Sequence, residues 1–316
     1  MVHLVSVPFT DLQVNGGGGV LLNADPTVEG VRRIAQAHAA RGTGDILPTV
    51  ITDRPEVTES AAWAAAELAG DTGVLGIHIE GPHFSLSRHG THRAADIRPL
   101  DRQTVDLVAA LREAAIRVMI TLAPEEADSS LLHELVTSGA IVSAGHSSAT
   151  AAQARAAFGQ GVNCVTHLFN AMEQMHSREA GLLGATLNSD VACGIICDGI
   201  HVSWDMLRIA LKARGPSAPT FVVSDAMATV GGPDWFELYG QRISVRDGRL
   251  VNSEGALAGA HIDMVQSFEN LMTHLDLPLE RALAMVSDIP RRVIGLPPRV
   301  IGTGSEVKGL VIMGQP

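Results

Sequence analysis

The chain has 316 residues, of which 46% are hydrophobic and 18% are charged, which is ample for one large α/β domain with a substantial core. Its formal net charge is −11 and it has no run rich in Lys or Arg, which argues against binding to nucleic acid or to an acidic membrane. Its three cysteines lie in apolar segments and indicate core thiols in a reducing compartment. The first residues lack a signal peptide, and no apolar run approaches the roughly 18 residues of a membrane span, so we expect a soluble cytoplasmic protein.

Eight short apolar segments predict β-strands, and segments with helical periodicity fill most of the intervals between them. The expected strands are Leu4–Val14, Asp45–Thr52, Val74–Gly81, Ile116–Ala123, Ala140–His146, Asn163–Asn170, Val191–Asp198 and Thr220–Asp225. The expected helices are Thr27–Arg41, Pro55–Ala69, Asp101–Ala115, Ser129–Ser138, Ala149–Phe158 and Trp204–Ala213, several of them opened by Ser, Thr or Asp in a capping position. This alternation predicts an α/β fold, a (β/α)₈ TIM barrel, whose active site lies at the carboxyl ends of the strands.

The chain outside this repeat carries weaker signals. Residues Gly16–Gly19 are interpreted as a strand–helix turn, because no Lys-Ser/Thr of a phosphate loop follows them. Residues Phe236–Val251 predict a hairpin with its turn at Asp247-Gly248, and helices are expected at Ile262–His274 and Pro278–Ser287. We treat residues 1–316 as a single barrel domain in which residues 300–316 supply one more strand.

Four of the predicted strands end in a side chain that can bind a metal or move a proton. Glu80 ends an apolar strand that Gly81 and Pro82 terminate, and His146 and His167 end two later strands. A carboxylate in such a buried position is costly unless a cation pairs with it. Asp225 ends a fourth strand. Together these residues predict a hydrolytic metal site with three protein ligands and an open position for water.

Seven motifs along the chain carry a resemblance to a known family. They are Asp11–Gly19, His78–Pro82, Gly90–His92, Gly145–Thr150, Thr166–Met172, Asp198–His201 and Ser224–Met227. In order and spacing they resemble the N-acetylglucosamine-6-phosphate deacetylase family of the amidohydrolase superfamily, from about Asp11 to about Leu296. The resemblance implies a metal-dependent enzyme that releases acetate from the N-acetyl group of an amino-sugar phosphate.

The resemblance also implies roles for residues at the strand ends. The family's metal ligands fall on Glu80, His146 and His167, and its catalytic acid/base falls on Asp225. Many amidohydrolases hold a second metal with a His-x-His pair, where this chain has Gln13 and Asn15. Because neutral amides are poor zinc ligands, we expect one divalent ion, Zn²⁺, with these two amides beside it.

Further residues are implied at the substrate. His92 matches a histidine that contacts the substrate carbonyl and would help to stabilise the oxyanion. Arg178 and His201 match the phosphate contacts, and Asn170 and the Ala171 backbone match other substrate contacts. In relatives the equivalent of the arginine reaches across a dimer interface, so the resemblance implies a homodimer.

The chain departs from the family in several places. Relatives carry a small accessory β-sandwich, and we expect it to be largely missing or truncated here, with residues 300–316 as a remnant. His83 follows Gly-Pro where an aromatic residue is usual, and it is interpreted either as a solvated loop residue or as a substrate contact. His261 and Asp263 stand where relatives have small hydroxyl residues, and an acid there would repel a nearby phosphate. Two alternatives therefore stay open: an amidohydrolase of the same chemistry acting on another N-acyl amino sugar or a specialised metabolite, and a catalytically silent sugar-phosphate binder.

Overall fold

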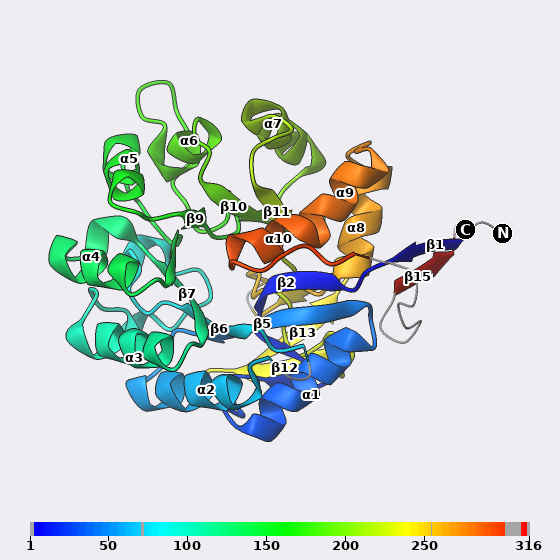
Figure 1. The fold of residues 1–316 in the computed structure, drawn as a ribbon, viewed down its shortest axis with the longest axis horizontal. Coiled ribbons are helices and arrows are strands. Elements are labelled where there is room, and N and C mark those ends of the chain that lie inside the picture. Colours follow the sequence, from blue (N-terminus) through cyan, green and yellow to red (C-terminus); the bar gives the residue numbers. More distant parts are fainter. Residues whose placement is uncertain (1–2, 71–72, 254, 301–310, 315–316) are drawn as a thin grey trace.

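Eight parallel strands form the centre of the molecule in the computed structural model, which describes residues 3–70, 73–253, 255–300 and 311–314. Seven of them fall inside a predicted strand, and β5 begins two residues before its predicted start at Asp45. Together they form the predicted barrel (Figure 1). The strands are β2 (Phe9–Val14), β5 (Thr43–Ile51), β6 (Gly76–Glu80), β7 (Arg117–Leu122), β8 (Ile141–Ala144), β9 (Cys164–Val165), β10 (Ala192–Ile195) and β11 (Thr220–Val222). Their side chains are buried almost throughout, as expected for strands covered on both faces.

The barrel closes where its first strand meets the segment that follows its last strand. A parallel bridge joins Val14 to Ala226. The backbone N–H groups of Asn15 and Gly16 both donate to the Ala226 carbonyl, and the Asp225 N–H donates to the Gln13 carbonyl. This seam therefore lies directly beside a predicted catalytic residue.

Helices surround the barrel, as Figure 1 shows. They are α1 (Val28–Ala39), α2 (Pro55–Leu68), α3 (Arg102–Glu113), α4 (Ser129–Thr137), α5 (Ala151–Gly159), α6 (Gly181–Leu187), α7 (Trp204–Arg214), α8 (Met264–Thr273), α9 (Leu279–Val286) and α10 (Asp288–Val293), with short 3₁₀ helices at η1 (Leu86–Arg88), η2 (Ala94–Asp96) and η3 (Pro124–Glu126). The predicted caps are present at Thr27 and Asp101, and Thr150 and Ser203 cap two further helices; each side chain accepts a backbone N–H of the first turn. Ser129 was expected to open α4, but Asp128 caps it. Helix α6 was not predicted, because all seven of its residues are buried and show no amphipathic periodicity.

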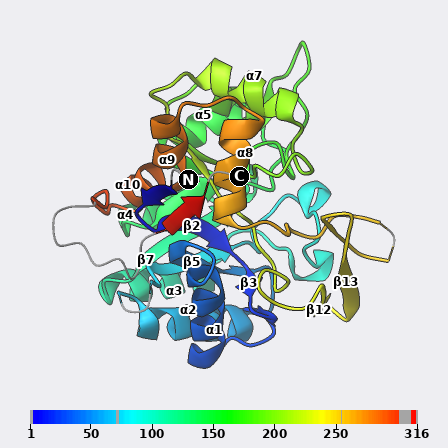
Figure 2. The same ribbon diagram turned by 90° about the vertical axis from the view of Figure 1, so that its right-hand side faces the viewer.

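A small antiparallel sheet lies at the side of the barrel, as Figure 2 shows. Its strands are β12 (Trp235–Leu238), β13 (Gln241–Arg246) and β14 (Arg249–Val251), and the predicted turn at Asp247-Gly248 joins the last two. Sequence reasoning missed the second turn, between β12 and β13. Apolar side chains of the sheet pack with the end of β5 and with neighbouring hairpin and loop residues in a second cluster, which contains Leu21, Ile51, Met227, Ala228, Phe236, Leu238, Ile243, Leu250 and Ala258.

Two further strand pairs lie outside the barrel. The predicted turn at Gly16–Gly19 is a tight hairpin of β3 (Gly16–Gly17) and β4 (Val20–Leu21), so the interpretation as a plain strand–helix turn was wrong. Strands β1 (His3–Ser6) and β15 (Val311–Gly314) pair antiparallel, which joins the two ends of the described chain. The rest of the expected strand at 300–316 lies outside the described residues, apart from residue 300.

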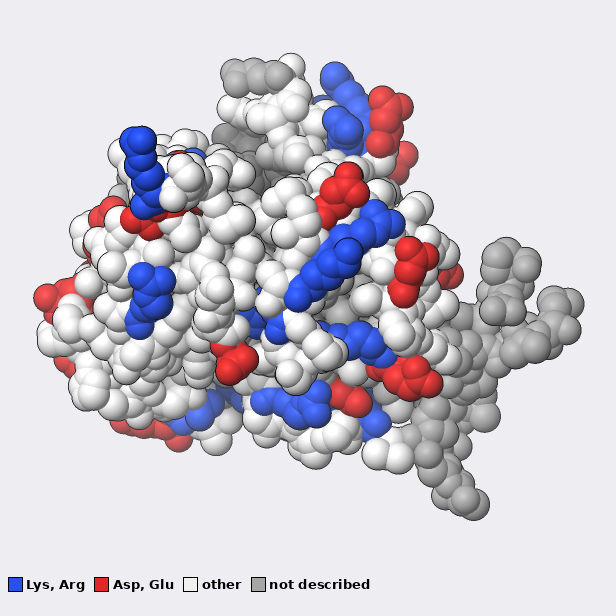
Figure 3. All heavy atoms as spheres, turned by 90° about the horizontal axis from the view of Figure 1, so that it is seen from above, with Lys and Arg blue, Asp and Glu red and all other residues white. Residues whose placement is uncertain are grey.

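Charged side chains are spread over the face shown in Figure 3, where positive and negative groups lie close together on a mostly uncharged surface. Among the helices of the described residues, none combines the length and the apolar character needed to span a bilayer.

Candidate metal centre

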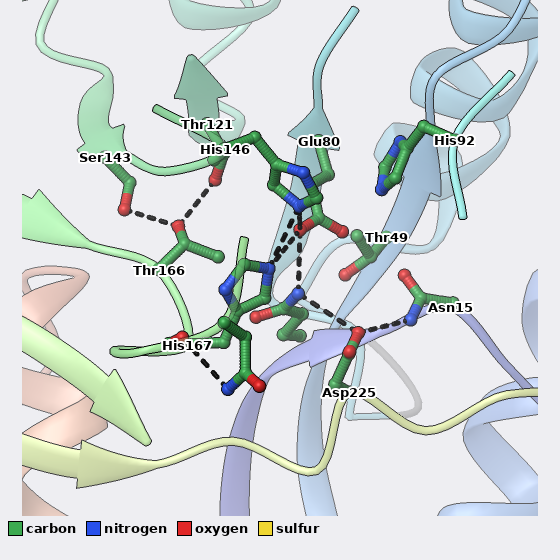
Figure 4. A network of polar contacts seen from close by, with 12 residues as sticks. Asn15, Thr49, Glu80, His92, Thr121, Ser143, His146, Thr166, His167 and Asp225 are labelled. Atoms are coloured by element: carbon green, nitrogen blue, oxygen red, sulfur yellow. Dashed lines mark hydrogen bonds and ion pairs between the residues drawn. The ribbon is translucent and has the colours of Figure 1, made fainter. Parts of the chain in front are cut away.

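Three predicted ligands converge at the carboxyl ends of β6, β8 and β9 (Figure 4). Glu80 Oε1 lies 3.1 Å from His167 Nε2 and 3.4 Å from His146 Nε2, and the two Nε2 atoms are 3.1 Å apart. In a tetrahedral zinc site with bonds of about 2.0–2.2 Å, neighbouring ligand atoms are about 3.3–3.6 Å apart. The side chains are nearly fully buried and bring one carboxylate and two imidazoles together. Their spacing and chemistry fit a divalent metal ion.

Hydrogen bonds prepare this group for a cation. His146 Nδ1 lies 2.8 Å from the Arg88 carbonyl, which can only accept, so Nδ1 carries the proton and Nε2 keeps a free lone pair. Burial by itself would raise the pKa of Glu80, but the adjoining His146 and His167 side chains outweigh it and hold the pKa well below its usual range. Glu80 is thus an anionic group beside a neutral imidazole nitrogen of His146, which suits a cation.

His92 lies close enough to be a fourth ligand, since ligand atoms of Glu80, His92 and His146 fall within 4.8 Å of one another. Its hydrogen bonds favour another role. The Thr52 N–H donates to His92 Nδ1 at 3.3 Å, so Nδ1 is an acceptor and the proton sits on Nε2. Burial, followed by the neighbouring His146, lowers the pKa of His92 to about 3, which keeps the ring neutral. A protonated Nε2 donates a hydrogen bond and does not bind a metal.

Asp225 lies beside the metal group and is held by the two predicted amides. Asn15 Nδ2 donates to Asp225 Oδ1 at 2.7 Å (Figure 4). Gln13 Nε2 donates to both Asp225 Oδ1 and Glu80 Oε1, at 3.1 and 3.0 Å. These amides present donors to the carboxylates and so do not reproduce a second metal site. Burial, followed by the charge of Glu80, raises the pKa of Asp225 to about 6, which suits a group that takes and returns a proton near neutral pH.

The backbone at this site is unusual. His146, His167 and Asp225 have φ angles of 48°, 28° and 53°, in the left-handed region that side chains other than glycine rarely adopt. Such conformations are seen at functional sites, where the surrounding structure enforces them. Each of these residues comes two or three positions after the last residue of its strand, where the chain turns.

A cavity of about 160 Å³ opens in front of these groups. The predicted substrate residues Asn170, Ala171 and His201 line it together with His92 and Asp225. His201 Nδ1 is 2.6 Å from Asp198 Oδ2, which orients the ring. The predicted phosphate ligand Arg178 is exposed on the loop after β9 and does not line the cavity. Within the described part of one chain, the cavity lining contains no Lys or Arg.

Comparisons with known proteins agree with this geometry. The family model described as the amidohydrolase family matches residues 5–300. The chain belongs to the amidohydrolase family. It is 36% identical over 309 residues to an N-acetylglucosamine-6-phosphate deacetylase of Haemophilus influenzae, an alignment that covers 96% of this chain and 79% of the relative. It is 39% identical to an N-acetylgalactosamine-6-phosphate deacetylase of Shewanella sp. strain ANA-3, with 92% and 74% covered.

Solved structures are similar over the same range. The N-acetylglucosamine-6-phosphate deacetylase of Pasteurella multocida superposes with a TM-score of 0.87 at 35% identity, covering 94% of this chain and 80% of that one. A variant of the enzyme from Mycobacterium smegmatis, in complex with N-acetyl-D-glucosamine-6-phosphate, superposes with a TM-score of 0.89 at 30% identity, covering 99% and 83%.

Three residues of this amidohydrolase that support the site were not singled out from the sequence. Phe84 stacks on the His146 ring, with centroids 4.1 Å apart and planes at 11°. Thr52 and Arg88 orient His92 and His146 through backbone groups. Phe84 follows the Glu80 motif by a few residues, and an aromatic side chain so close to a predicted ligand was the one sequence feature that could have indicated a residue supporting the site. The contacts made by the backbone groups of Thr52 and Arg88 could not be predicted from the sequence.

The residues of uncertain role have structural partners in this amidohydrolase. His83 is fully buried, with Nδ1 at 2.9 Å from the Pro99 carbonyl and Nε2 at 2.9 Å from Thr104 Oγ1. Both interpretations of His83, as a solvated loop residue and as a substrate contact, were therefore wrong. His261 Nδ1 lies 2.8 Å from Thr229 Oγ1. Asp263 caps α8 and does not line the cavity.

Proposed function

We propose that this amidohydrolase hydrolyses the N-acetyl group of N-acetylglucosamine 6-phosphate to give glucosamine 6-phosphate and acetate. The observation that carries the proposal is the presence, in one cavity, of a Glu-His-His metal group and a separate carboxylate, Asp225, whose pKa is raised to about 6. The similarity to deacetylases along nearly the whole chain points to the same reaction.

The residues divide the reaction between them. Glu80, His146 and His167 would hold one divalent cation, which we expect to be Zn²⁺ and which, when bound, acidifies water and polarises the amide carbonyl. Asp225 accepts the proton of the attacking water and returns it to the departing nitrogen. His92 donates its Nε2–H to the carbonyl oxygen as negative charge develops there. Gln13 and Asn15 orient the Asp225 carboxylate throughout.

The sugar phosphate would be held at the other end of the cavity. His201, Asn170 and the Ala171 backbone line that cavity and offer polar contacts. A phosphate also needs a cation there, and the cavity lining of one chain supplies none among the described residues. We therefore infer that Arg178, exposed on its loop, completes the site of a second copy in a homodimer. The buried free thiols Cys164, Cys193 and Cys197 support a reducing, cytoplasmic location.

A panel assay tests the substrate. Acetate release from N-acetylglucosamine with and without the 6-phosphate should show a strong preference for the phosphorylated sugar. N-acetylgalactosamine 6-phosphate belongs in the panel, because the Shewanella relative carries that substrate in its name. Preference for an unphosphorylated N-acyl compound would refute the proposal.

Mixed dimers test the role of Arg178. Arg178→Ala should weaken use of the phosphorylated sugar about ten- to a hundredfold, since a charged hydrogen bond contributes about 1.5–3 kcal/mol. A heterodimer can be made from one Arg178→Ala chain and one Asp225→Asn chain. If the arginine acts across the interface, one of its two sites combines the intact Asp225 of the first chain with the intact Arg178 of the second. Activity well above that of either homodimer is expected. A monomeric protein, or a heterodimer as poor as its parents, would refute the shared site.

A further inference from the structure

The turn between β12 and β13 has an unexpected residue at its first central position. Leu238 pairs with Gln241, so Tyr239 and Gly240 form a two-residue turn, with φ angles of 52° and 77°. Such turns favour Asn, Asp or Gly, and a bulky side chain with positive φ is a genuine outlier. Strain of this kind persists only where other contacts enforce it.

Two contacts hold Tyr239 in this conformation. Its hydroxyl donates to the backbone carbonyl of Thr52, at the end of β5. The guanidinium of Arg93 lies over its ring, 5.4 Å from the centroid. Tyr239 is also the single tyrosine of the chain, which makes its hydroxyl a unique spectroscopic probe.

Both contacts lead to His92. The N–H of Thr52 donates to His92 Nδ1, and the Thr52 hydroxyl lies 2.8 Å from the same nitrogen. Arg93 is the next residue after His92. Phe84 and His146 pack against the His92 ring edge-on, with centroids 5.0 and 4.6 Å away, and the Thr52 contacts are the hydrogen bonds to its Nδ1. Tyr239 thus ties together the two segments that fix this imidazole.

We propose that Tyr239 is a positioning residue that holds His92 with its Nε2–H directed at the substrate carbonyl oxygen. The proposal rests on the proposed function, in which His92 is the donor to that oxygen. A donor to a developing oxyanion acts more strongly in the transition state than in the ground state. Misplacing His92 therefore lowers kcat and leaves KM nearly unchanged.

The conservative variant Tyr239→Phe tests this. It removes the hydroxyl and keeps the ring over Arg93. We expect kcat to fall about tenfold, while KM and metal content stay unchanged. This loss is smaller than the hundredfold or greater loss that follows removal of an oxyanion donor, because His92 is misplaced and not removed. Arg242→Gln is the matched control, because it breaks the other cation–π pair of the same sheet, over Trp235, away from His92. This control should keep wild-type kcat.

A double-mutant cycle separates the positioning role from the proposed function. His92→Ala should lower kcat at least about a hundredfold, and Tyr239→Phe should add nothing further in that background. Additive effects, or wild-type kcat in Tyr239→Phe, would overturn the positioning role while the role of His92 stands. Unchanged kcat in His92→Ala would overturn both.

A second measurement does not depend on turnover. The ¹⁵N shifts of the imidazole should report His92 in the Nε2–H tautomer in the unmodified protein and a mixture of tautomers or ring orientations in Tyr239→Phe. Identical spectra for the two proteins would show that the hydroxyl does not act on His92.

Discussion

The hydrogen bond from Asn15 to Asp225 gives a test of how the site tunes its acid/base group. Asn15 Nδ2 donates to Asp225 Oδ1 at 2.7 Å and stabilises the ionised carboxylate. A hydrogen bond to a charged group contributes about 1.5–3 kcal/mol, and one pKa unit corresponds to about 1.36 kcal/mol. Because water can replace part of the lost bond, Asn15→Ala should raise the pKa of Asp225 by about one unit.

The sign follows from the proposed role of Asp225. As a base it works in its ionised form, so kcat/KM falls as the pH drops below its pKa. Burial and the charge of Glu80 raise that pKa to about 6, and a cation bound to Glu80 would offset the effect of its charge. The acid limb of the pH profile, where kcat/KM falls as the pH drops, should therefore lie at or below about pH 6 in the unmodified enzyme. In Asn15→Ala the limb moves upward by about one unit.

The assay is acetate release from N-acetylglucosamine 6-phosphate, measured as kcat/KM between pH 5 and about pH 9 at fixed metal content. Asn170→Ala is the matched control, because Asn170 lines the same cavity but donates only to the carbonyls of His167 and Leu168. It should change KM without moving the limb. An unmoved limb in Asn15→Ala, or equal shifts in both variants, would refute the reasoning.

Three further predictions concern the metal, the proton transfer and the frame of the barrel. Protein purified without chelator should contain close to one metal ion per chain by elemental analysis, and two tightly held ions would contradict the reading of Gln13 and Asn15. Asp225→Asn should keep that metal while turnover falls at least about a hundredfold, and near-normal turnover would place the base elsewhere. Asp45 is buried near the amino end of β5 and pairs with Arg291 and, at 2.7 Å, with Arg299. Asp45→Asn should lower the free energy of unfolding by about 3–5 kcal/mol in urea titrations and leave kcat unchanged, and a change in kcat would show that the two barrel ends are coupled.

Much of the barrel could be predicted because its strands and helices follow regular patterns. Strand ends also place Glu80, His146 and His167 together, since the carboxyl ends of parallel strands meet at one end of a barrel. The turn at Asp247-Gly248 was predicted because that dipeptide favours φ > 0, whereas the turn at Tyr239 was missed because no propensity favours tyrosine there.

Other features depend on contacts that no local pattern encodes. The hydrogen bond from His146 to the Arg88 carbonyl and the bond from Thr52 N–H to His92 involve backbone groups, which every residue carries. His83 was misjudged because a polar residue in a loop usually faces water, and here the loop folds back and encloses it. Arg178 stays apart from the cavity, and its predicted role depends on a second chain.

The seam of the barrel has a consequence for how the protein becomes active. Gln13 and Asp225 lie 212 positions apart, yet their backbones pair directly at the point of closure. Contacts between segments so distant form slowly, which favours closure after the intervening strands and helices have formed. We therefore expect the proposed base to be assembled late in folding, and a local opening of the seam to separate its parts while most helices persist. On dilution from denaturant, recovery of deacetylase activity should trail recovery of the helical circular dichroism signal.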